Sequence, residues 1–569
     1  MGADSAYCER AEHPFVAPPE LHGDSRRYPV LIVGAGPVGL AAAACLARFG
    51  IETVVIERNR RAGEGSRAIC LSRRSLEILD WIGVANLFVA KGLGWTRGRA
   101  FYRERQIHEL CMPHGDTEKF LPMTNLQQYY MEEFLAQHCA TQPLVGLRWG
   151  SELVDLERRP QEVVATIATP EGSYRLSCSY LLATDGARSQ VRKRLGLPFE
   201  GSSFTGRYLI ADIRLRSAHP TERRAWFDPP SNRGSTILMH RQPDEVWRID
   251  YQLHDTDDEV IELQPQSVRS RVQRHLDFIG ERGEWELLWS SIYRARSLAL
   301  RTYVHGRILF AGDAAHLVPI FGVRGLNSGF ADAHNLAWKL AWVLHGRAGD
   351  SLLETYTQER RAATLEIHRQ ADKTTRFMTP RTRGDLLMRD AALSLAVEHE
   401  FVRPLVDPRQ SVPYVYGDSP LNSFGSGNAP ASGADFRNGP RPGAPLPNLR
   451  VRHRSGSGYL LDWLGSGFVG IFFIRGECTP ADREVLADLH ARCNLRLLVV
   501  TDVRPDGRFE SDDETLVLLQ DVANVAGQIY GACAGTLYLA RPDGHVCARW
   551  KRAVTAELIG AMQRACAAC

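Results

Sequence analysis

The sequence contains no run of about 18 uncharged apolar residues, so it predicts no membrane-spanning helix and no membrane partner. Residues 1–27 are polar and lack the apolar segment of a signal peptide, which predicts a polar N-terminal extension and a cytoplasmic protein. An excess of one charge is also missing, because 69 Lys and Arg against 66 Asp and Glu give a formal net charge of +3. This balance argues against nucleic acid as a partner, since nucleic-acid-binding proteins normally carry a clustered basic excess.

Cysteine is scarce as well, and 12 cysteines in 569 residues are too few for a disulfide-stabilised fold. The one C-x-x-C pair, Cys566 and Cys569, has no second cysteine or histidine pair near it, so no metal site is predicted. The remaining composition is that of an ordinary globular protein, with 44% apolar and 24% charged residues. At this length the chain is expected to form roughly three or four structural units.

Hydrophobic periodicity divides the chain into regions of different secondary structure. A buried strand at 28–33, an Ala- and Leu-rich helix and a β-branched strand at 53–56 form a βαβ unit. Between 208 and 253 short strands alternate with Pro, Asn, Gly and Asp clusters, which predicts an antiparallel sheet inserted into the first domain. A stretch rich in Gly, Pro, Ser and Asn near 417–447 indicates a linker.

The turn inside the βαβ unit carries the first candidate binding site, Gly34-Ala-Gly36-Pro37-Val-Gly39. Gly34 permits a tight turn, Gly36 lets a pyrophosphate approach the backbone, and Gly39 lets the helix pack closely on the sheet. The helix N-terminus supplies N–H groups and partial positive charge to a phosphate. Glu57, at the end of the second strand, is placed to accept hydrogen bonds from ribose hydroxyls, so the unit predicts a dinucleotide site.

Two later segments favour FAD over NAD as the dinucleotide. One begins at Asp185 and reads Asp-Gly-Ala-Arg188 directly after a strand. The other contains Gly312-Asp313 after a buried strand and continues to Gly325-Leu326-Asn327 at the start of a helix. With these three motifs, in this order, residues 28 to 400 resemble the class A (single-component) flavoprotein monooxygenases, the aromatic hydroxylase family.

The resemblance implies an α/β fold in which a Rossmann-type FAD-binding domain contains an inserted antiparallel-sheet substrate domain and is followed by a thioredoxin-like α/β domain. The expected divisions are the extension 1–27, the noncontiguous FAD-binding domain 28–205 and 290–400, the substrate domain 206–289 with parts of 95–125, the linker 401–438, and the thioredoxin-like domain 439–569. The last domain resembles that of the branch that includes phenol hydroxylase and 3-(3-hydroxyphenyl)propionate hydroxylase types.

Within this C-terminal region, Arg541-Pro-Asp-Gly544-His-Val is the segment that most resembles the domain of that branch. A working thioredoxin needs two cysteines where its first strand meets its helix. Here that place reads Cys478-Thr-Pro-Ala481, so the resolving cysteine is missing. Because thiol–disulfide exchange needs both thiols, we expect a structural or dimer-packing role for the domain, and a homodimer for the protein.

For the non-covalent cofactor FAD, the resemblance and the dinucleotide pattern together give a set of expected binding residues. Asp313 would bind the ribityl or pyrophosphate part, and Arg67 and Gln128 would contact the cofactor. Asp185 and Arg188 match a motif associated with both FAD and NAD(P)H. The full expected set is Gly34, Gly36, Pro37, Gly39, Glu57, Arg58, Arg67, Gln128, Asp185, Arg188, Gly312, Asp313, Gly325, Leu326 and Asn327.

The resemblance also implies that NADH or NADPH reduces FAD, that O2 is captured as a C4a-hydroperoxide, and that a small phenolic substrate is hydroxylated. The substrate must be oriented and its hydroxyl ionised. Candidate residues for this work are Arg324, Tyr293, His240 and Asp250. Arg324 stands where the family often has Gln, and either it holds an anionic group or it forms a salt bridge at a domain seam. Tyr293, His240 and Asp250 are otherwise hydrogen-bonded sheet residues, and the strand at 246–253 can turn either face to the pocket.

Two alternative functions remain open at the level of sequence. One keeps the fold and makes the protein a Baeyer–Villiger or polyketide-tailoring flavin monooxygenase, which depends on a pocket volume that the sequence does not give. The other is a non-catalytic, redox-gated flavoprotein binding module. The sequence also does not distinguish NADH from NADPH, and it does not give the position that is hydroxylated.

Overall fold

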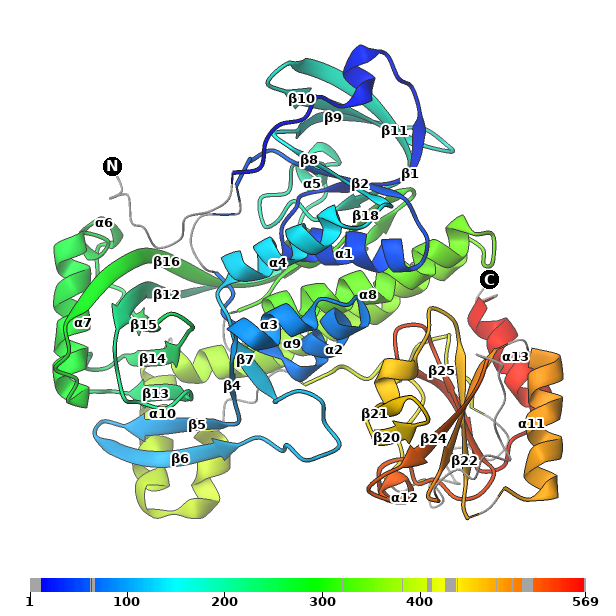
Figure 1. Ribbon diagram of the computed structural model, residues 1–569. Coiled ribbons are helices and arrows are strands. Elements are labelled where there is room, and N and C mark those ends of the chain that lie inside the picture. Colours follow the sequence, from blue (N-terminus) through cyan, green and yellow to red (C-terminus); the bar gives the residue numbers. More distant parts are fainter. Residues whose placement is uncertain are drawn as a thin grey trace.

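A computed structural model describes residues 12–61, 63, 67–319, 322–380, 382–406, 412–424, 436, 438–476, 478–493, 495–503 and 515–566. Residues 1–11 of the predicted extension and Cys569 lie outside these ranges. Figure 1 shows a first, largely parallel sheet with helices beneath it, a second sheet to one side and a separate C-terminal sheet. Within the described residues no helix is long and apolar enough to cross a membrane.

The first sheet has the order β17-β18-β11-β1-β2-β8, and β9 and β10 are attached to it through β11. Its strands β1, β2, β8, β11 and β18 run parallel to their neighbours, as expected for strands that are buried on both faces. The bounds are β1 (Arg27–Val33), β2 (Thr53–Glu57), β8 (Val145–Trp149), β9 (Glu152–Arg158), β10 (Val163–Thr169), β11 (Gly172–Ala183), β17 (Val304–His305) and β18 (Ile308–Phe310). The strand from 28 to 33 and the strand from 53 to 56 are therefore close to where the periodicity predicts them.

Helices α1 (Pro37–Arg48), α4 (Gln128–Ala140) and α8 (Gly325–Leu344) lie together on one side of this sheet (Figure 1). Helix α9 (Ser351–Met378) packs against α8 and reaches the second sheet. A small sheet of β3 (Cys70–Ser72), β7 (Met123–Asn125) and β4 (Leu93–Trp95) stands beside helices α2 (Arg73–Trp81) and α3 (Ala85–Lys91).

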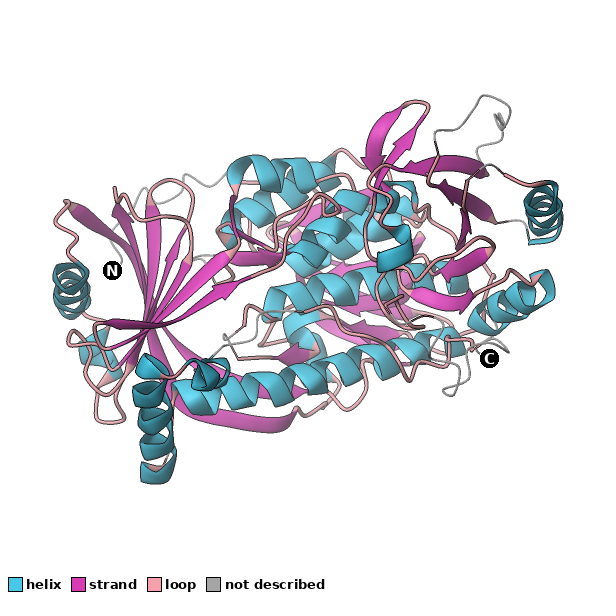
Figure 2. Ribbon diagram, turned by 90° about the horizontal axis from the view of Figure 1, so that it is seen from below, coloured by secondary structure: helices cyan, strands magenta, loops and turns pink. Residues whose placement is uncertain are grey.

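The second sheet is almost entirely antiparallel and has the order β19-β16-β12-β15-β14-β13-β5-β6. Its strands are β5 (Arg97–Tyr102), β6 (Arg105–Cys111), β12 (Glu200–Leu215), β13 (Arg223–Phe227), β14 (Thr236–Arg241), β15 (Val246–Gln252), β16 (Trp285–Ala299) and β19 (His316–Leu317). Helices α6 (Glu259–Glu262) and α7 (Pro265–Ile279) lie beyond β15 in the chain, and α10 (Arg383–Glu398) packs against β5 and β6. In the view from below, its strands fan out at the end of the molecule opposite the C-terminus (Figure 2).

The C-terminal sheet has the order β21-β20-β24-β23-β22-β25-β26. Strands β22, β23 and β24 are parallel, and β25 and β26 complete the sheet as an antiparallel hairpin. The bounds are β20 (Arg450–His453), β21 (Gly456–Tyr459), β22 (Val469–Ile474), β23 (Arg496–Thr501), β24 (Leu516–Asp521), β25 (Thr536–Ala540) and β26 (Val546–Trp550), with helices α11 (Pro480–Cys493), α12 (Ala526–Ile529) and α13 (Thr555–Cys566).

The apolar core of the nucleotide-binding region continues into the C-terminal region. Trp338 and Trp342 of α8 pack edge-on against Phe468, which precedes β22. All three belong to one buried cluster that also includes strands of the first sheet. The C-terminal region is therefore joined to α8 by a buried surface and not only through a linker.

Candidate active site

The three glycines of the β1–α1 turn have three different environments. Gly34 has φ +106°, and a Cβ there would lie 2.7 Å from the carbonyl oxygen of Thr184. A Cβ on Gly39 would lie 2.0 Å from the carbonyl oxygen of Gly34. A Cβ on Gly36 would meet no atom within 4 Å. Gly34 and Gly39 are therefore required by packing inside the protein, whereas Gly36 borders open space of the kind that a bound pyrophosphate needs.

Helix α1 begins directly at this open space. Its N-cap residue, Gly36, has no side chain, and Pro37 occupies the first helical position. The first intrahelical bond runs from the N–H of Leu40 to the carbonyl of Gly36, so the preceding N–H groups have no partner within the helix. A phosphate would satisfy these groups and the positive end of the helix dipole.

Glu57 ends β2 beside the same turn. Its carboxylate accepts from the N–H of Ala35 at 3.1 Å and from the backbone and side chain of Asn59 at 3.0 and 2.9 Å. These bonds fix the half-buried carboxylate at the mouth of the turn. Arg58 and Arg188 are also predicted to bind the cofactor, and both have exposed side chains. Contact of these residues with a ribose or a nicotinamide cofactor stays a prediction.

Asp185 follows β11 and is tied to a short helix. Its Oδ2 accepts from the N–H groups of Gln190 at 2.6 Å and Val191 at 3.1 Å, at the start of α5 (Gln190–Arg194). Its Oδ1 is buried and has no hydrogen-bond partner among the described residues. Burial raises the pKa of this carboxyl, partly offset by bonds to Ser189 and the helix N–H groups. A buried acceptor without a partner is compatible with the predicted role of Asp185 in cofactor binding.

Gln128, at the start of α4, supports the loop that carries Arg67. Its Oε1 accepts from the N–H of Ala68 at 3.0 Å, and its Nε2 donates to Glu132 Oε1 at 2.8 Å. Glu132 Oε2 in turn accepts from the N–H of Gly63 at 2.9 Å. The side chain of Arg67 is exposed. Gln128 thus positions the backbone on both sides of Arg67, a role that the resemblance alone did not predict.

Gly312 and Asp313 form the short helical turn η2 (Gly312–Ala314) after β18. The N–H of Gly312 donates to Asp332 Oδ2 at 3.0 Å. Asp332 is buried and also binds His316 Nε2 at 2.6 Å and Arg360 Nε at 2.6 Å. Burial raises the pKa of Asp332, but His316 and Arg360 outweigh it and hold this pKa below its usual value. The charged Asp332 therefore fixes the backbone next to Asp313.

The side chain of Asp313 is exposed, yet enough protein surrounds it for burial to raise its pKa. The charges of His316 and Arg67 oppose this shift. Tyr293 is the next neighbour: its hydroxyl donates to the carbonyl of Val318 at 3.0 Å, and burial together with the Asp313 charge raises its pKa. Asp313 therefore lies near both Arg67 and Tyr293.

Helix α8 begins at Gly325 with Arg324 as its N-cap. Its first intrahelical bond runs from Ser328 N to the carbonyl of Arg324, which leaves the N–H groups of Gly325, Leu326 and Asn327 without a partner in the helix. Arg324 is buried, and no side chain caps the helix. This N-terminus is thus a second place where backbone N–H groups and the helix dipole can stabilise negative charge.

The amide of Asn327 is engaged by the protein itself. Its Oδ1 accepts from Ser72 N at 2.9 Å and Ser75 Oγ at 2.6 Å, and its Nδ2 donates to the carbonyls of Cys70 and Val323 at 3.2 and 2.6 Å. All four hydrogen-bonding positions of the amide are filled. Contact of Asn327 with the cofactor stays a prediction, and its backbone N–H is the group left for that contact.

The loop before α8 is strained. Val323 has φ +57°, a region that costs a residue with a Cβ roughly 1–2 kcal/mol. Its side chain packs on a small apolar cluster of Cys70, Trp95 and Met123. The charge of Arg223, from the second sheet, acts on the Cys70 thiol. The Arg324 loop and the second sheet therefore approach each other at Cys70.

The second sheet turns its polar face to these loops. Trp247, Ile249 and Tyr251 of β15 pack on α7 in a separate apolar core. On the opposite face, Arg248 Nη1 donates to the carbonyl of Arg67 at 3.2 Å, and Arg248 binds Asp212 through two bonds of 2.7 Å. This answers the question that the sequence left open about which face of β15 meets the cofactor region.

The cross-strand register places three of the candidate residues on this polar face. His240 is paired with Arg248, and Asp250 lies two residues further along β15. Tyr293 is paired with Tyr208, which is itself paired with Gln252, two residues beyond Asp250. Because paired residues and residues two apart share a face, His240, Asp250 and Tyr293 all lie on the same side of the sheet.

Asp250 and His240 are both buried, and each has an atom without a hydrogen-bond partner among the described residues, Oδ1 and Nδ1 respectively. Burial raises the pKa of Asp250 to about 7; the charge of Asp212 adds to this, and those of Arg248 and Arg223 oppose it. Burial, with the charges of Arg223 and Arg248, lowers the pKa of His240 to about 3. At neutral pH, His240 is therefore neutral and Asp250 is close to its titration midpoint.

Sequence reasoning missed Asp332, Asp212 and Arg248. A signal for Asp332 exists, because it is the one acidic residue of the largely buried helix α8. Arg248 and Asp212 lie far apart in sequence, and only the pairing of β12 with β15 brings them together. No group of three or more His, Cys, Asp or Glu within the described chain is arranged to hold a metal ion.

Two uncapped helix N-termini, an open glycine and a buried free carboxylate oxygen at the edge of one parallel sheet make a site for a dinucleotide, and the fold is that of a flavoprotein. Residues 27–371 match the family described as FAD binding domain, and the chain belongs to this family. The predicted FAD cofactor and α/β fold class are thereby confirmed.

Two relatives show the breadth of the family around this chain. The 3-(3-hydroxy-phenyl)propionate/3-hydroxycinnamic acid hydroxylase 2 of Burkholderia vietnamiensis is 30% identical over 66% of this chain and 68% of its own length. The 6-methylpretetramide 4-monooxygenase of Streptomyces rimosus is 30% identical over 96% of this chain and 94% of its own length. The first is named a hydroxylase and the second a monooxygenase, and the second aligns with the C-terminal region as well.

Solved structures share the fold over nearly the whole chain. The flavin-dependent monooxygenase PieE, in complex with FAD and substrate, has a TM-score of 0.76 and 23% identity, and covers 95% of this chain and 99% of its own. The OxyS anhydrotetracycline hydroxylase from Streptomyces rimosus has a TM-score of 0.67 and 26% identity, with coverage of 95% and 99%. The predicted class, an FAD-dependent monooxygenase with a C-terminal thioredoxin-like domain, is confirmed.

Proposed function

We propose that this enzyme uses NADH or NADPH and O2 to hydroxylate a phenolic aromatic substrate held between FAD and the polar face of the second sheet. The observation that carries this proposal is the buried Asp250, whose free Oδ1 lies on the face that contacts the Arg67 loop. The names of the two relatives, a hydroxylase of hydroxyphenyl acids and a monooxygenase, support it.

In this proposal FAD supplies the oxygen-activating chemistry when bound, and the chain prepares the substrate. Asp250 accepts the hydrogen bond of the phenol and takes its proton at Oδ1, which makes the ring carbon more nucleophilic. Arg248, held by Asp212, supplies positive charge beside the resulting phenolate. Arg324 holds an anionic group at the start of α8, and Tyr293 stays protonated beside Asp313.

FAD itself would be held by the open turn at Gly36, by Asp313 and Arg67, and by the N–H groups of Gly325 and its two successors. Asp185 would accept a cofactor hydroxyl with its free Oδ1. We further propose a homodimer and a cytoplasmic location, as the sequence predicts. The proposal also includes the domain limits and the other cofactor contacts that the sequence predicts.

A second candidate substrate class, a phenol within a fused polycyclic polyketide, is favoured by one observation. The 6-methylpretetramide 4-monooxygenase aligns with 96% of this chain, whereas the hydroxyphenyl propionate hydroxylase aligns with 66%. Both candidates need the same proton acceptor and the same cofactor. They differ in the size of ring system that the space between the sheet and the flavin loops admits.

The deciding experiment measures NADH and NADPH oxidation with matched pairs of phenols and their methyl ethers, monocyclic and fused. We expect a suitable phenol to accelerate flavin reduction and to gain one oxygen atom per O2 consumed, as read by mass spectrometry. The methyl ether serves as the control, because it has no proton for Asp250 to accept. If no aromatic compound in a broad panel changes the rate, the hydroxylase function is wrong and the redox-gated binding module replaces it.

A further inference from the structure

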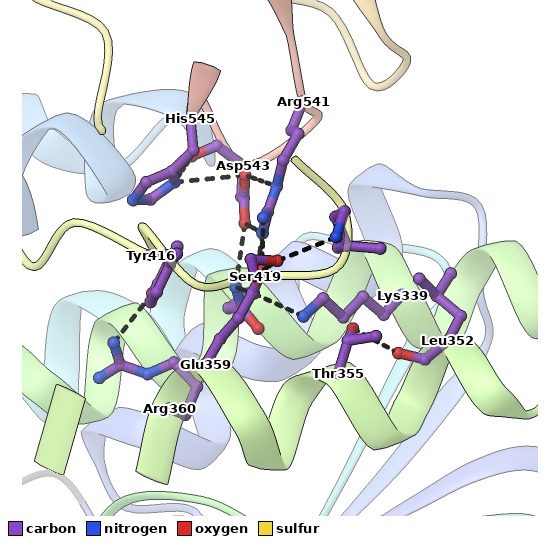
Figure 3. A network of polar contacts seen from close by, with 12 residues as sticks. Lys339, Leu352, Thr355, Glu359, Arg360, Tyr416, Ser419, Arg541, Asp543 and His545 are labelled. Carbon is purple, nitrogen blue, oxygen red and sulfur yellow. Dashed lines mark hydrogen bonds and ion pairs between the residues drawn. The ribbon is translucent and has the colours of Figure 1, made fainter. Parts of the chain in front are cut away.

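The hairpin turn between β25 and β26 reaches out of the C-terminal domain and ends in a buried charge network (Figure 3). Arg541 and Asp543 of this turn have side chains that are 0% and 1% exposed. Arg541 binds Asp543 through two bonds, 3.0 Å to Oδ1 and 2.5 Å to Oδ2. Asp543 Oδ2 also accepts from Asn335 and Trp338 of α8, at 3.0 and 3.1 Å.

Glu359 of α9 is the centre of this network. Its Oε1 accepts from Arg541 Nη1 and Ser419 Oγ, each at 2.5 Å. Its Oε2 accepts from Lys339 Nζ at 2.6 Å, from Asn335 at 2.8 Å and from Arg541 Nη2 at 3.0 Å. Five donors on one carboxylate from three parts of the chain fix its position closely.

The charges in the network compensate one another. Burial raises the pKa of Glu359, but the charges of Arg541 and Lys339 outweigh it and hold this pKa far below its usual range. Burial lowers the pKa of Lys339 to about 8, against the pull of Glu359. Removing one partner would leave an uncompensated buried charge, so the network holds together or loosens as a unit.

Helix α9 carries the network towards the flavin loops. Tyr356, Glu359 and Arg360 are spaced i, i+3 and i+4 and therefore lie on one face of the helix. The Tyr356 hydroxyl donates to the carbonyl of Phe310, the last residue of β18, at 2.8 Å. Arg360 Nε donates to Asp332 at 2.6 Å, and Arg360 Nη2 donates to Ser328 Oγ at 2.8 Å.

Asp332 completes the connection, because it accepts from the N–H of Gly312, next to Asp313. Ser328 is in the first turn of α8, whose free N–H groups precede it. Arg360 Nη1 also donates to the hydroxyl of Tyr416, at 2.9 Å, and Tyr416 lies in the segment that leads to the C-terminal domain. Polar side-chain contacts of Glu359 and of Arg360, which are consecutive residues of α9, thus join the C-terminal turn to both flavin loops.

We propose that the Arg541–His545 turn of the C-terminal domain is part of the apparatus that holds FAD, with Arg541 and Glu359 as positioning residues for the Gly312–Asp313 loop and the start of α8. The C-terminal domain thereby acts on FAD through α9, without direct contact with FAD. This goes beyond the proposed function, since it concerns retention of FAD and not the substrate.

A second contact across the same seam provides a matched control. Lys119 binds Asp80 of α2 at 2.6 Å and Asp462 of the C-terminal domain at 2.7 Å. This bridge ties the two domains together, and its hydrogen-bond partners, Asp80 and Asp462, belong neither to α9 nor to the flavin loops. A variant such as Asp462→Asn therefore weakens the seam without acting on the proposed path.

The experiment compares the rate of FAD release from the holoenzyme, read as the gain of free flavin fluorescence on dilution. Arg541→Lys keeps the buried charge and loses the bidentate fork, so it is the variant expected to fold. We expect it to speed FAD release by about tenfold and to shift the midpoint potential of bound FAD. Asp462→Asn should stay within about twofold of the parent protein.

A double-mutant cycle with Arg360→Lys tests the path itself. If the effect passes from Glu359 to Arg360, Arg541→Lys should increase the rate of FAD release by less than about twofold in a protein that already carries Arg360→Lys. A full and independent effect in that background overturns the proposal. So does a folded Arg541→Lys enzyme that releases FAD at the parental rate, or an Asp462→Asn enzyme that releases it equally fast.

Discussion

At the scale of single residues, Asp250 combines two features that rarely occur together. It is buried on a sheet face and its Oδ1 has no partner among the described residues. Because burial raises its pKa to about 7, the proton stays on in the folded protein at a pH where an exposed carboxyl has lost it. The sequence names Asp250 as a candidate but does not give its burial, which depends on packing from outside β15.

Replacing Asp250 with Asn should remove the proton acceptor and keep the shape of the side chain. In the parent enzyme, turnover of a phenol should rise as the pH increases through about 7, because only the ionised Asp250 accepts the proton. Asp250→Asn should lose this rise and about 10²-fold or more in kcat. The pH–rate profile with a saturating phenol is the measurement, and an unchanged profile would remove Asp250 from the mechanism.

The same substitution should increase the stability of the protein, although it lowers the activity. The folded pKa of Asp250 is raised from 3.8 to about 7, so stability that is present below the unfolded pKa is lost as the pH rises through about 7. Asp250→Asn should therefore gain stability relative to the parent protein between pH 5 and 8. His240→Asn is the matched control, because His240, with a pKa of about 3, is neutral over this range.

At the scale of elements, the β1–α1 turn and the start of α8 are local structures whose sequence signals are strong. A turn that exposes N–H groups to a phosphate is formed by consecutive residues, and its glycines are needed for reasons that act within a few residues. The strands and helices around both motifs accordingly lie close to where the pattern predicts them. The antiparallel sheet was predicted, but its register and the face that it turns to the flavin loops could not be, because register is fixed by residues far apart in the chain.

The substitution Gly36→Ala tests whether Gly36 is needed for cofactor binding and not for packing inside the protein. The new Cβ would meet no protein atom within 4 Å, and Gly36 has φ −70°, so the unfolding free energy without FAD should change by less than about 0.5 kcal/mol. Because the methyl group occupies the open space, FAD should bind about tenfold more weakly or worse. Titration of the FAD-free protein with FAD measures this.

Gly39→Ala provides the contrast in the same turn. Its Cβ would lie 2.0 Å from the carbonyl of Gly34, so the protein itself should lose about 1–3 kcal/mol of stability before any cofactor is added. If Gly36→Ala destabilised the FAD-free protein as much as Gly39→Ala does, the space at Gly36 would not be a cofactor site.

At the scale of the whole molecule, the C-terminal domain has the fold of a thioredoxin-like unit but is fixed to α8 and α9. Its Cys478 lacks the second cysteine, and burial and the charge of Asp482 raise the pKa of its thiol. A reactive thioredoxin thiol has the opposite shift. The domain is therefore better suited to a fixed packing role than to redox exchange.

Cys478→Ser should leave NAD(P)H oxidation with a phenol substrate unchanged, because neither the proposed chemistry nor the seam uses this thiol. Wild-type protein should likewise fail to reduce the disulfides of insulin in the presence of NADPH. Both assays use the full-length holoenzyme. A loss of hydroxylation in Cys478→Ser, or reduction of insulin that depends on Cys478, would show that the domain is redox-active.

The sequence by itself predicted the dinucleotide turn, because a phosphate-binding turn is built from neighbouring residues whose spacing is its signature. The cofactor and the class of enzyme followed from the resemblance of three motifs to the class A flavoprotein monooxygenases. The sequence also located Asp250, His240 and Tyr293 without placing them together. Only the tertiary structure decided which sheet face meets the flavin loops and that Arg541 and Glu359 share one buried network. Those features are contacts between distant segments, and their energies depend on burial that no local pattern contains.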